Sequence, residues 1–259
     1  PGPLLVAADL HLIAAADAPD DFMGLFAGPA VAASSIDEGR ATIASDFSAD
    51  AFGFVRFLVI DHSLSPQSAG ALTQRLLEIE TYRMLALLGL PVAQRLSQPI
   101  RRIEEELPQL LLAVEKGRGI EADRALLHRL TAIATELETG SSESLFRLGA
   151  TRAYHELVRA RLDSIRESRM PHYSTFASFL SRRLTPAMRT CATIEQRQAS
   201  LSSKIARIAE LLRTRVDIEL ESQNADQIRQ MAERVRLQLR LQQTVEGLSI
   251  AAITYYVSS

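Results

Sequence analysis

No glycine or proline interrupts residues 187–246, AMRTCATIEQRQASLSSKIARIAELLRTRVDIELESQNADQIRQMAERVRLQLRLQQTVE. A straight helix over this stretch would be about 90 Å long. Its first half has the apolar spacing of a coiled coil, in which Ile194 is followed by the stalk seam of Leu201, Ile205, Ile208 and Leu212. The spacing lapses over the polar residues 219–227 and then resumes. We predict one continuous stalk helix, whose seam is buried against either another subunit or the preceding helices.

Residues 1–64 carry a different pattern, rich in aromatic and β-branched residues. The clearest run is Phe54-Val55-Arg56-Phe57-Leu58-Val59-Ile60. We expect strands at residues 4–13, 31–36, 40–47 and 53–60, with a short helical turn at 20–26. Because short turns connect the later strands, we expect a small, mainly antiparallel sheet that packs against helices.

From Ser65 the apolar spacing becomes helical. Ser65-Pro66 is a helix-start signal. We expect Pro91 and Pro99 to kink or break the helix that follows, and Pro108 to open a further turn. Further helices are expected at residues 121–138, 144–169 and 175–183, separated by Gly117, Gly140 and Pro171, with no strand beyond Gly117.

The predicted fold class is therefore α+β and predominantly α. It consists of a small antiparallel sheet in residues 1–64, a helical subdomain in 65–183, the very long stalk helix in 184–246, and the start of a truncated membrane segment in 247–259.

The end of the stalk has the pattern of a membrane boundary. A membrane-proximal basic collar, formed by Arg229, Arg234, Arg236 and Arg240, precedes the uncharged run GLSIAAITYYV at residues 247–257. This run is shorter than the ~20 apolar residues of a spanning helix, so an ordinary buried helix end is the alternative. Arginine beside a span is retained in the cytoplasm, so we expect the preceding residues to face that side.

Composition and residue spacing limit the classes of function that this chain could have. The formal net charge is −2, which gives no general attraction to nucleic acid. Cys191 is the single cysteine, so no intrachain disulfide can form, and we expect it to be a small buried residue. The five histidines are scattered singly, without metal-ligand spacing. No phosphate-binding loop or nucleophile motif is present, so we predict no enzyme activity, identify no cofactor and leave any metal site undefined.

One group of polar residues stands out on the first expected helix: the polar cluster of Arg75, Glu78, Glu80, Tyr82 and Arg83. Spacings of three and four bring several of them together. They form either a ligand site or interface, or a set of ordinary ion pairs, and we favour the ion pairs.

Several motifs resemble one bacterial family. They are RLLEIETYR at 75–83, LLRTRVDI at 211–218 and LQLRLQQTVEGLS at 237–249, with Asp46-Phe47 and RRLTPAMRTC at 182–191. The family is domain of unknown function 3422, described as predicted membrane-anchored proteins. The resemblance implies membrane attachment, assigns no reaction, and leads us to expect further sequence at both ends.

The order of elements also resembles CorA-type divalent-metal transporters, in which a cytoplasmic α/β domain is followed by a stalk helix that enters the membrane. Architecture alone does not establish function. We expect a homo-oligomer at the bacterial inner membrane, acting as a CorA-like ion transporter or channel, with a divalent cation implied by analogy only. The alternative is a membrane-tethered scaffold or interaction protein without transport. We expect no nucleic-acid partner.

Overall fold

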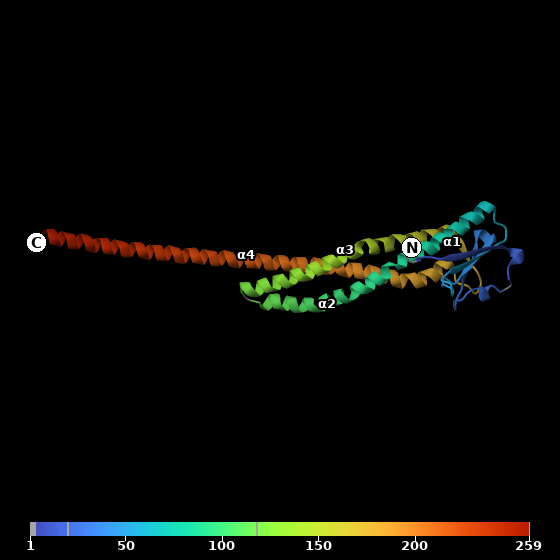
Figure 1. Cartoon of the computed structure of the whole chain (residues 1–259), viewed down its shortest axis with the longest axis horizontal. Coiled ribbons are helices and arrows are strands. Elements are labelled where there is room, and N and C mark those ends of the chain that lie inside the picture. Colours follow the sequence, from blue (N-terminus) through green and yellow to red (C-terminus); the bar gives the residue numbers. More distant parts are fainter. Residues whose placement is uncertain (1–3, 20, 118, 259) are drawn as a thin grey trace. The chain divides into compact units, whose positions relative to one another are not determined.

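The computed structural model describes residues 4–19, 21–117 and 119–258. In its last helix, side chains are described as far as Gln243, and the side chain of Val245 is described as well. The chain divides into two compact units. The first contains Pro1–Ile103 and Glu136–Leu201, and the second contains Glu104–Thr135 and Ser202–Ser259. Figure 1 shows the elements along the chain.

The first unit contains a five-stranded sheet in the order β1-β4-β3-β2-β5. Its strands are β1 (Ala8–Ala14), β2 (Ala32–Ile36), β3 (Ala41–Ser45), β4 (Val55–Asp61) and β5 (Glu167–Arg169). β2, β3 and β4 pair antiparallel, as the short turns predict. β1, however, pairs with β4 in parallel, so the sheet is mixed.

Three of the four strand pairings are antiparallel, so the prediction of a mainly antiparallel sheet is confirmed, whereas one prediction about the position of strands was wrong. The parallel pairing of β1 with β4 is possible because no short turn joins β1 to its neighbour in the sheet. Residues 15–31 instead carry the chain from β1 to β2, which is three places away in the sheet. The expectation of no strand beyond Gly117 fails at β5, which pairs antiparallel with β2. β5 has only three residues, Glu-Ser-Arg, and no apolar alternation that could mark it as a strand.

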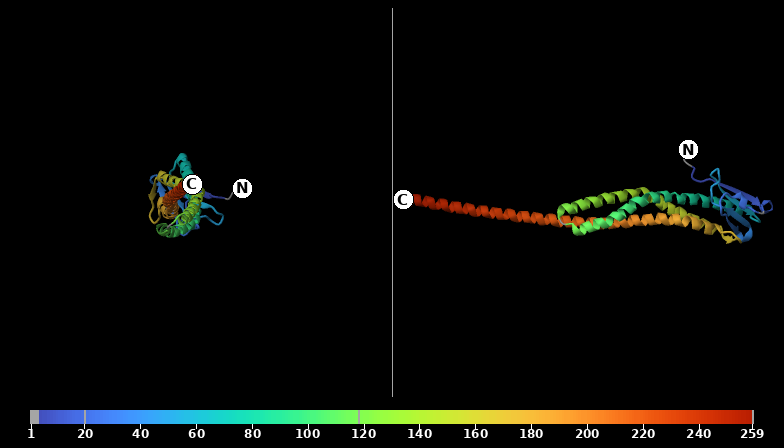
Figure 2. Two further views of the ribbon diagram at one scale, coloured as in Figure 1. Left: turned by 90° about the vertical axis from the view of Figure 1, so that its left-hand side faces the viewer. Right: turned by 90° about the horizontal axis from the view of Figure 1, so that it is seen from below.

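Alternate residues of β4 enter different apolar clusters, as expected for a strand buried on both sides. Phe57 and Val59 belong to the main core of this unit, with side chains from α1 (Pro66–Leu87), α3 (Ile120–Ser164) and the start of α4 (Phe176–Ser258). Leu58 and Ile60 join a smaller cluster that includes Phe22. In the right-hand view of Figure 2, the strands lie next to α1 and the start of α4.

β5 also fixes the start of α4. The Glu167 carboxylate accepts hydrogen bonds from the backbone N–H of Phe176 and of Ala177, both at 2.8 Å. It also accepts one from the Ser34 hydroxyl at 2.5 Å. Ser34 is fully buried on β2. One carboxylate thus satisfies the first amides of α4 and joins them to the sheet.

The first helix begins where expected, and the predicted breaks near Pro91, at Gly117 and at Pro171 are present, but the helices run through Pro99 and Gly140. Ser65 caps α1 by accepting from the Ser68 N–H at 3.1 Å. Pro99 and Pro108 lie inside α2 (Gly89–Lys116), and Pro186 lies inside α4. An interior proline costs about 3 kcal/mol, which the burial of neighbouring apolar residues offsets. In α2 these are Ile100, Ile103, Leu107 and Leu110.

Gly140 lies inside α3 rather than at a helix end. A Cβ there would stand 3.2 Å from the Leu96 side chain and 3.6 Å from the Gln198 amide. Gly140 therefore serves close packing of neighbouring helices.

The stalk prediction is confirmed. α4 is the longest helix and passes without reversal through residues 186–247. Leu201, Ile205, Ile208 and Leu212 are all buried.

In the second unit, α4 packs on the preceding helices. There Arg215 Nη1 donates to the Val114 carbonyl at 2.9 Å and lies 3.6 Å from Asp123 Oδ1. Leu107 of α2 and Leu130 of α3 are buried in the same unit. Within this chain, the preceding helices thus cover the part of the stalk seam that belongs to the second unit.

Candidate functional site

Three segments that are distant in sequence meet around Phe47. The ring of Phe47 makes edge contacts with Phe57 of β4 at 5.5 Å and Phe176 of α4 at 4.9 Å, between ring centres. The Arg83 guanidinium of α1 lies 5.8 Å from the centre of the same ring. Phe47 has a left-handed backbone (φ 51°), which is uncommon for a bulky residue.

The Asp46 side chain and backbone explain how this conformation is held. The carboxylate accepts from the Gly28 N–H at 2.7 Å and the Ser48 N–H at 3.1 Å. The Asp46 carbonyl accepts from Arg183 Nη1 at 2.9 Å, and the guanidinium of Arg183 lies 4.1 Å over the ring of Phe179. Asp46-Phe47 and Arg183, which belong to separate motifs, therefore contact each other directly.

Glu80 and Arg83 form a buried bidentate pair. Arg83 Nε and Nη2 each donate to a Glu80 carboxylate oxygen at 2.7 Å, and Glu80 is 1% exposed. Such a pair is costly to break by removing one partner, because the remaining charge would be buried alone. The arrangement around Phe47 thus has the character of a structural support.

The other members of the polar cluster lie in different surroundings. Glu78 accepts from Gln74 at 2.8 Å and from Arg161 of α3, and these hydrogen bonds hold the pKa of its carboxyl below the ordinary value. Tyr82 stacks on Tyr154 at 6.0 Å. Arg75 lines a separate cavity. The five residues are therefore divided among several local arrangements.

The described residues of α4 beyond Leu220 are exposed, without a break from Glu221 to Gln243. All four arginines of the basic collar lie here. Arg229 pairs with Asp226 at 3.3 Å. By helical spacing, Arg229, Arg236 and Arg240 share one face, whereas Arg234 lies on another.

An apolar series, which we term the outer seam, also lies on the exposed part of α4. Its members recur every seven residues, with two more at the complementary heptad position: Leu211, Ile218, Ala225, Ala232 and Leu239, with Ile228 and Val235. Leu211 is 69% and Ile218 62% exposed, although Leu212 and Val216 nearby are buried. Leu211 and Ile218 were not predicted from the sequence, because the stalk seam lies on another face of the helix and ends at the polar residues 219–227. The strict seven-residue spacing of the outer seam could have identified both residues.

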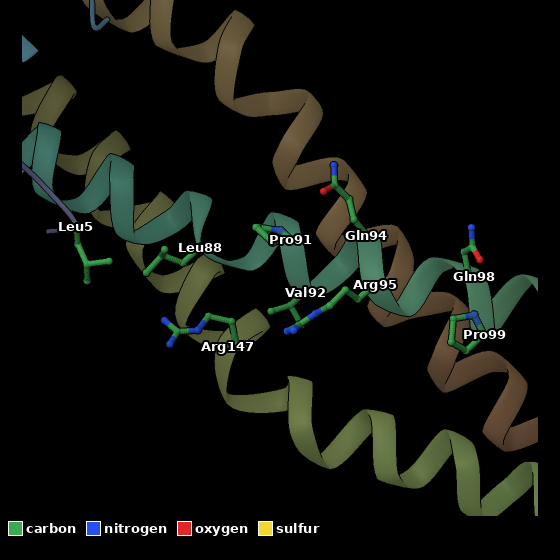
Figure 3. A pocket seen from close by; sticks show the side chains of 9 residues that line it. All are labelled: Leu5, Leu88, Pro91, Val92, Gln94, Arg95, Gln98, Pro99 and Arg147. Atoms are coloured by element: carbon green, nitrogen blue, oxygen red, sulfur yellow. The ribbon is translucent and has the colours of Figure 1, made fainter. Parts of the chain in front are cut away.

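A broad surface groove of about 1020 Å³ lies in the first unit. Figure 3 shows Pro91, Val92 and Arg95 from α2 along it, with Arg147 from α3 nearby. Its lining contains no carboxylate, histidine or cysteine. Over the described part of the chain, no group of three or more His, Cys, Asp or Glu residues is placed to hold a metal ion.

No helix in the described part of the chain is long and apolar enough to cross a membrane. The side chains of the predicted membrane segment, residues 247–259, lie outside the description.

The chain matches the family model "Protein of unknown function (DUF3422)" over residues 1–259. It therefore belongs to this family, as the motifs indicated. No curated protein matches the chain.

Proposed function

We propose that this chain is part of a membrane-attached protein whose copies associate through α4 on the cytoplasmic side of the bacterial inner membrane. The observation that carries the proposal is the exposed outer seam. An apolar series with seven-residue spacing is characteristic of helices that pack on a partner helix. We infer a second copy of this chain as the partner, because each copy presents the same seam at the same place.

Charge favours a parallel arrangement of the copies. With Leu211, Ile218 and Leu239 at heptad position a, arginines 229 and 236 occupy position e, whereas Asp217 and Asn224 occupy position g. Parallel helices bring e beside g of the partner, while antiparallel helices bring e beside e. The parallel arrangement thus avoids placing arginine beside arginine, and it gathers the C-terminal ends.

Membrane attachment is supported by the order of features after the outer seam. The basic collar is followed by the uncharged run at residues 247–257. Arginines in this position favour retention of the preceding residues in the cytoplasm and attract anionic headgroups.

A parallel bundle of α4 helices leading into a membrane has the layout of a CorA-type transporter, and ion transport is the activity that we propose for the assembled protein. A divalent cation is the substrate that this analogy suggests. A membrane-tethered scaffold is the second candidate, because the buried pairs around Phe47 support a rigid binding module equally well.

Sedimentation analysis of the purified chain tests the association. Ile228→Asp with Val235→Asp places charge in the outer seam and should weaken self-association by about tenfold or more. Gln227→Asp with Gln230→Asp, which lies off the seam, is the matched control and should leave it unchanged. A chain that is monomeric at all concentrations, or a control that dissociates equally, contradicts the proposal.

Divalent-cation flux into liposomes carrying the complete natural protein tests the activity. Flux that is lost in the Ile228→Asp, Val235→Asp variant supports transport. An assembled protein without flux favours the scaffold.

A further inference from the structure

A half-enclosed cavity of about 340 Å³ lies among α1, the end of β2 and the turn after α3. Its polar lining residues are Asp37, Gln67, Ser68, Arg75, Ser164 and Arg166. Leu72 and Ile165 contribute apolar wall. The volume is at the lower end of the range for small-molecule sites.

Two arginines from different elements line this cavity. Arg75 belongs to α1 and is half-buried, while Arg166 follows α3 and is exposed. Among the described residues, neither guanidinium forms an ion pair within 4.0 Å. Arg83 and Arg161, close by in sequence, each have a carboxylate partner. Arg75 helps to lower the pKa of the Glu78 carboxyl, but only at a distance beyond an ion pair, so both arginines retain the capacity to bind an anion.

The remaining polar groups are compatible with a bound anion. Asp37 is the carboxylate in the lining, and Arg40 holds it at 3.2 Å. The Ser65 hydroxyl donates to Ser68 Oγ at 2.9 Å, which leaves the proton of the Ser68 hydroxyl available to a ligand. Ser68 also stands in the first turn of α1, where the helix dipole favours negative charge.

Left-handed backbone conformations occur on two sides of the cavity. Asp37 and Arg166 both have φ 50°, and Glu38 has φ 55°. Residues with a side chain rarely adopt this conformation. The fold thus maintains unfavourable backbone geometry at two of the residues that contribute polar groups to the cavity, Asp37 and Arg166.

We propose that this cavity binds a phosphate monoester of a small molecule. Arg75 and Arg166 bind the phosphate oxygens, since guanidinium groups match that geometry, and the Ser68 hydroxyl donates to the same group. The carbon backbone of the organic part lies against Leu72 and Ile165, and its hydroxyl groups face Gln67 and Ser164. This site is independent of self-association through α4.

Isothermal titration of the purified chain with glycerol 3-phosphate, inorganic phosphate or chloride at matched ionic strength tests the proposal. Glycerol 3-phosphate should bind saturably and more tightly than inorganic phosphate. Arg75→Gln and Arg166→Gln should each weaken it by about tenfold or more. Arg189→Gln removes the same charge from an exposed position outside the cavity and should have no effect.

A second variant controls for the possibility that the arginine variants lose binding because they misfold. Ala71 lines the cavity within α1, so Ala71→Leu fills space without removing charge and should abolish binding while the circular dichroism spectrum is unchanged. The proposal is overturned if neither phosphate compound binds saturably, or if Arg189→Gln weakens binding as much as Arg166→Gln. Binding that survives Ala71→Leu, or equal affinity for inorganic phosphate, also overturns the assignment.

Discussion

Replacing Glu167 by alanine should destabilise the first unit by about 3 kcal/mol. The substitution removes a carboxylate that accepts from the Phe176 and Ala177 amides and from the buried Ser34 hydroxyl. Hydrogen bonds to charged groups contribute about 1.5–3 kcal/mol each. The loss of stability is smaller than the sum of three such hydrogen bonds, because the Phe176 N–H still donates to the Ser34 oxygen at 3.3 Å and the Ala177 N–H can donate to water.

Urea unfolding followed by circular dichroism measures the loss, and hydrogen exchange locates it at the amides of Phe176 and Ala177. Glu167→Gln keeps one acceptor oxygen and should lose about half as much. Glu138→Ala, on an exposed position of α3, is the matched control and should change stability by less than about 0.5 kcal/mol. If Glu167→Ala behaves like this control and the two amides remain protected, β5 does not hold the start of α4.

Three further predictions concern single sites. Gly28→Ala should cost about 1–3 kcal/mol in urea unfolding, because the new Cβ would stand 2.8 Å from Asp46 Oδ2; Gly24→Ala, with open space around it, should be tolerated. Burial lowers the pKa of half-buried His155, so the unfolded chain takes up the proton first as the pH falls. Thermal stability should therefore fall as the pH drops below about 6.5. His155→Gln should reduce that dependence, and an unchanged dependence of stability on pH in this variant would refute the prediction. Burial also raises the pKa of the Cys191 thiol, so an aromatic disulfide reagent should label it slowly in native buffer and rapidly in denaturant, and immediate native labelling would contradict this.

Local signals in the sequence predicted the features that depend on near neighbours. Ser65-Pro66 marked the start of α1, because capping involves residues within one turn. The absence of glycine and proline in residues 187–246 predicted the continuity of α4. The stalk seam was found for the same reason, since its spacing is a property of a single helix.

Features that depend on distant residues could not be read in this way. Nothing in Glu167–Arg169 favours a strand, and β5 forms because the end of α3 brings these residues to the edge of β2. Likewise, Gly140 resembles a helix end until the Leu96 side chain that fills the adjacent space is known. Tertiary packing decides such positions, and propensity is only a weak prior.

The candidate site shows the same division. Helical spacing placed Glu80 and Arg83 together, and the structure pairs them. The partners of the other residues come from elsewhere: Arg161 for Glu78 and Tyr154 for Tyr82. A spacing rule identifies a helix face but says nothing of the side chains that another element brings to it.

The pairing of β2 with β5 has a consequence for biosynthesis. Ser34 and Glu167 are 133 residues apart, so the ribosome must make the whole of α1, α2 and α3 before β2 receives its second neighbour. At typical elongation rates this takes roughly 10 s or more, during which one edge of β2 has unpaired backbone groups. Translation products that end before Glu167 keep that edge open permanently. They should pair with other chains and aggregate, whereas chains released after Ala177 can complete the sheet.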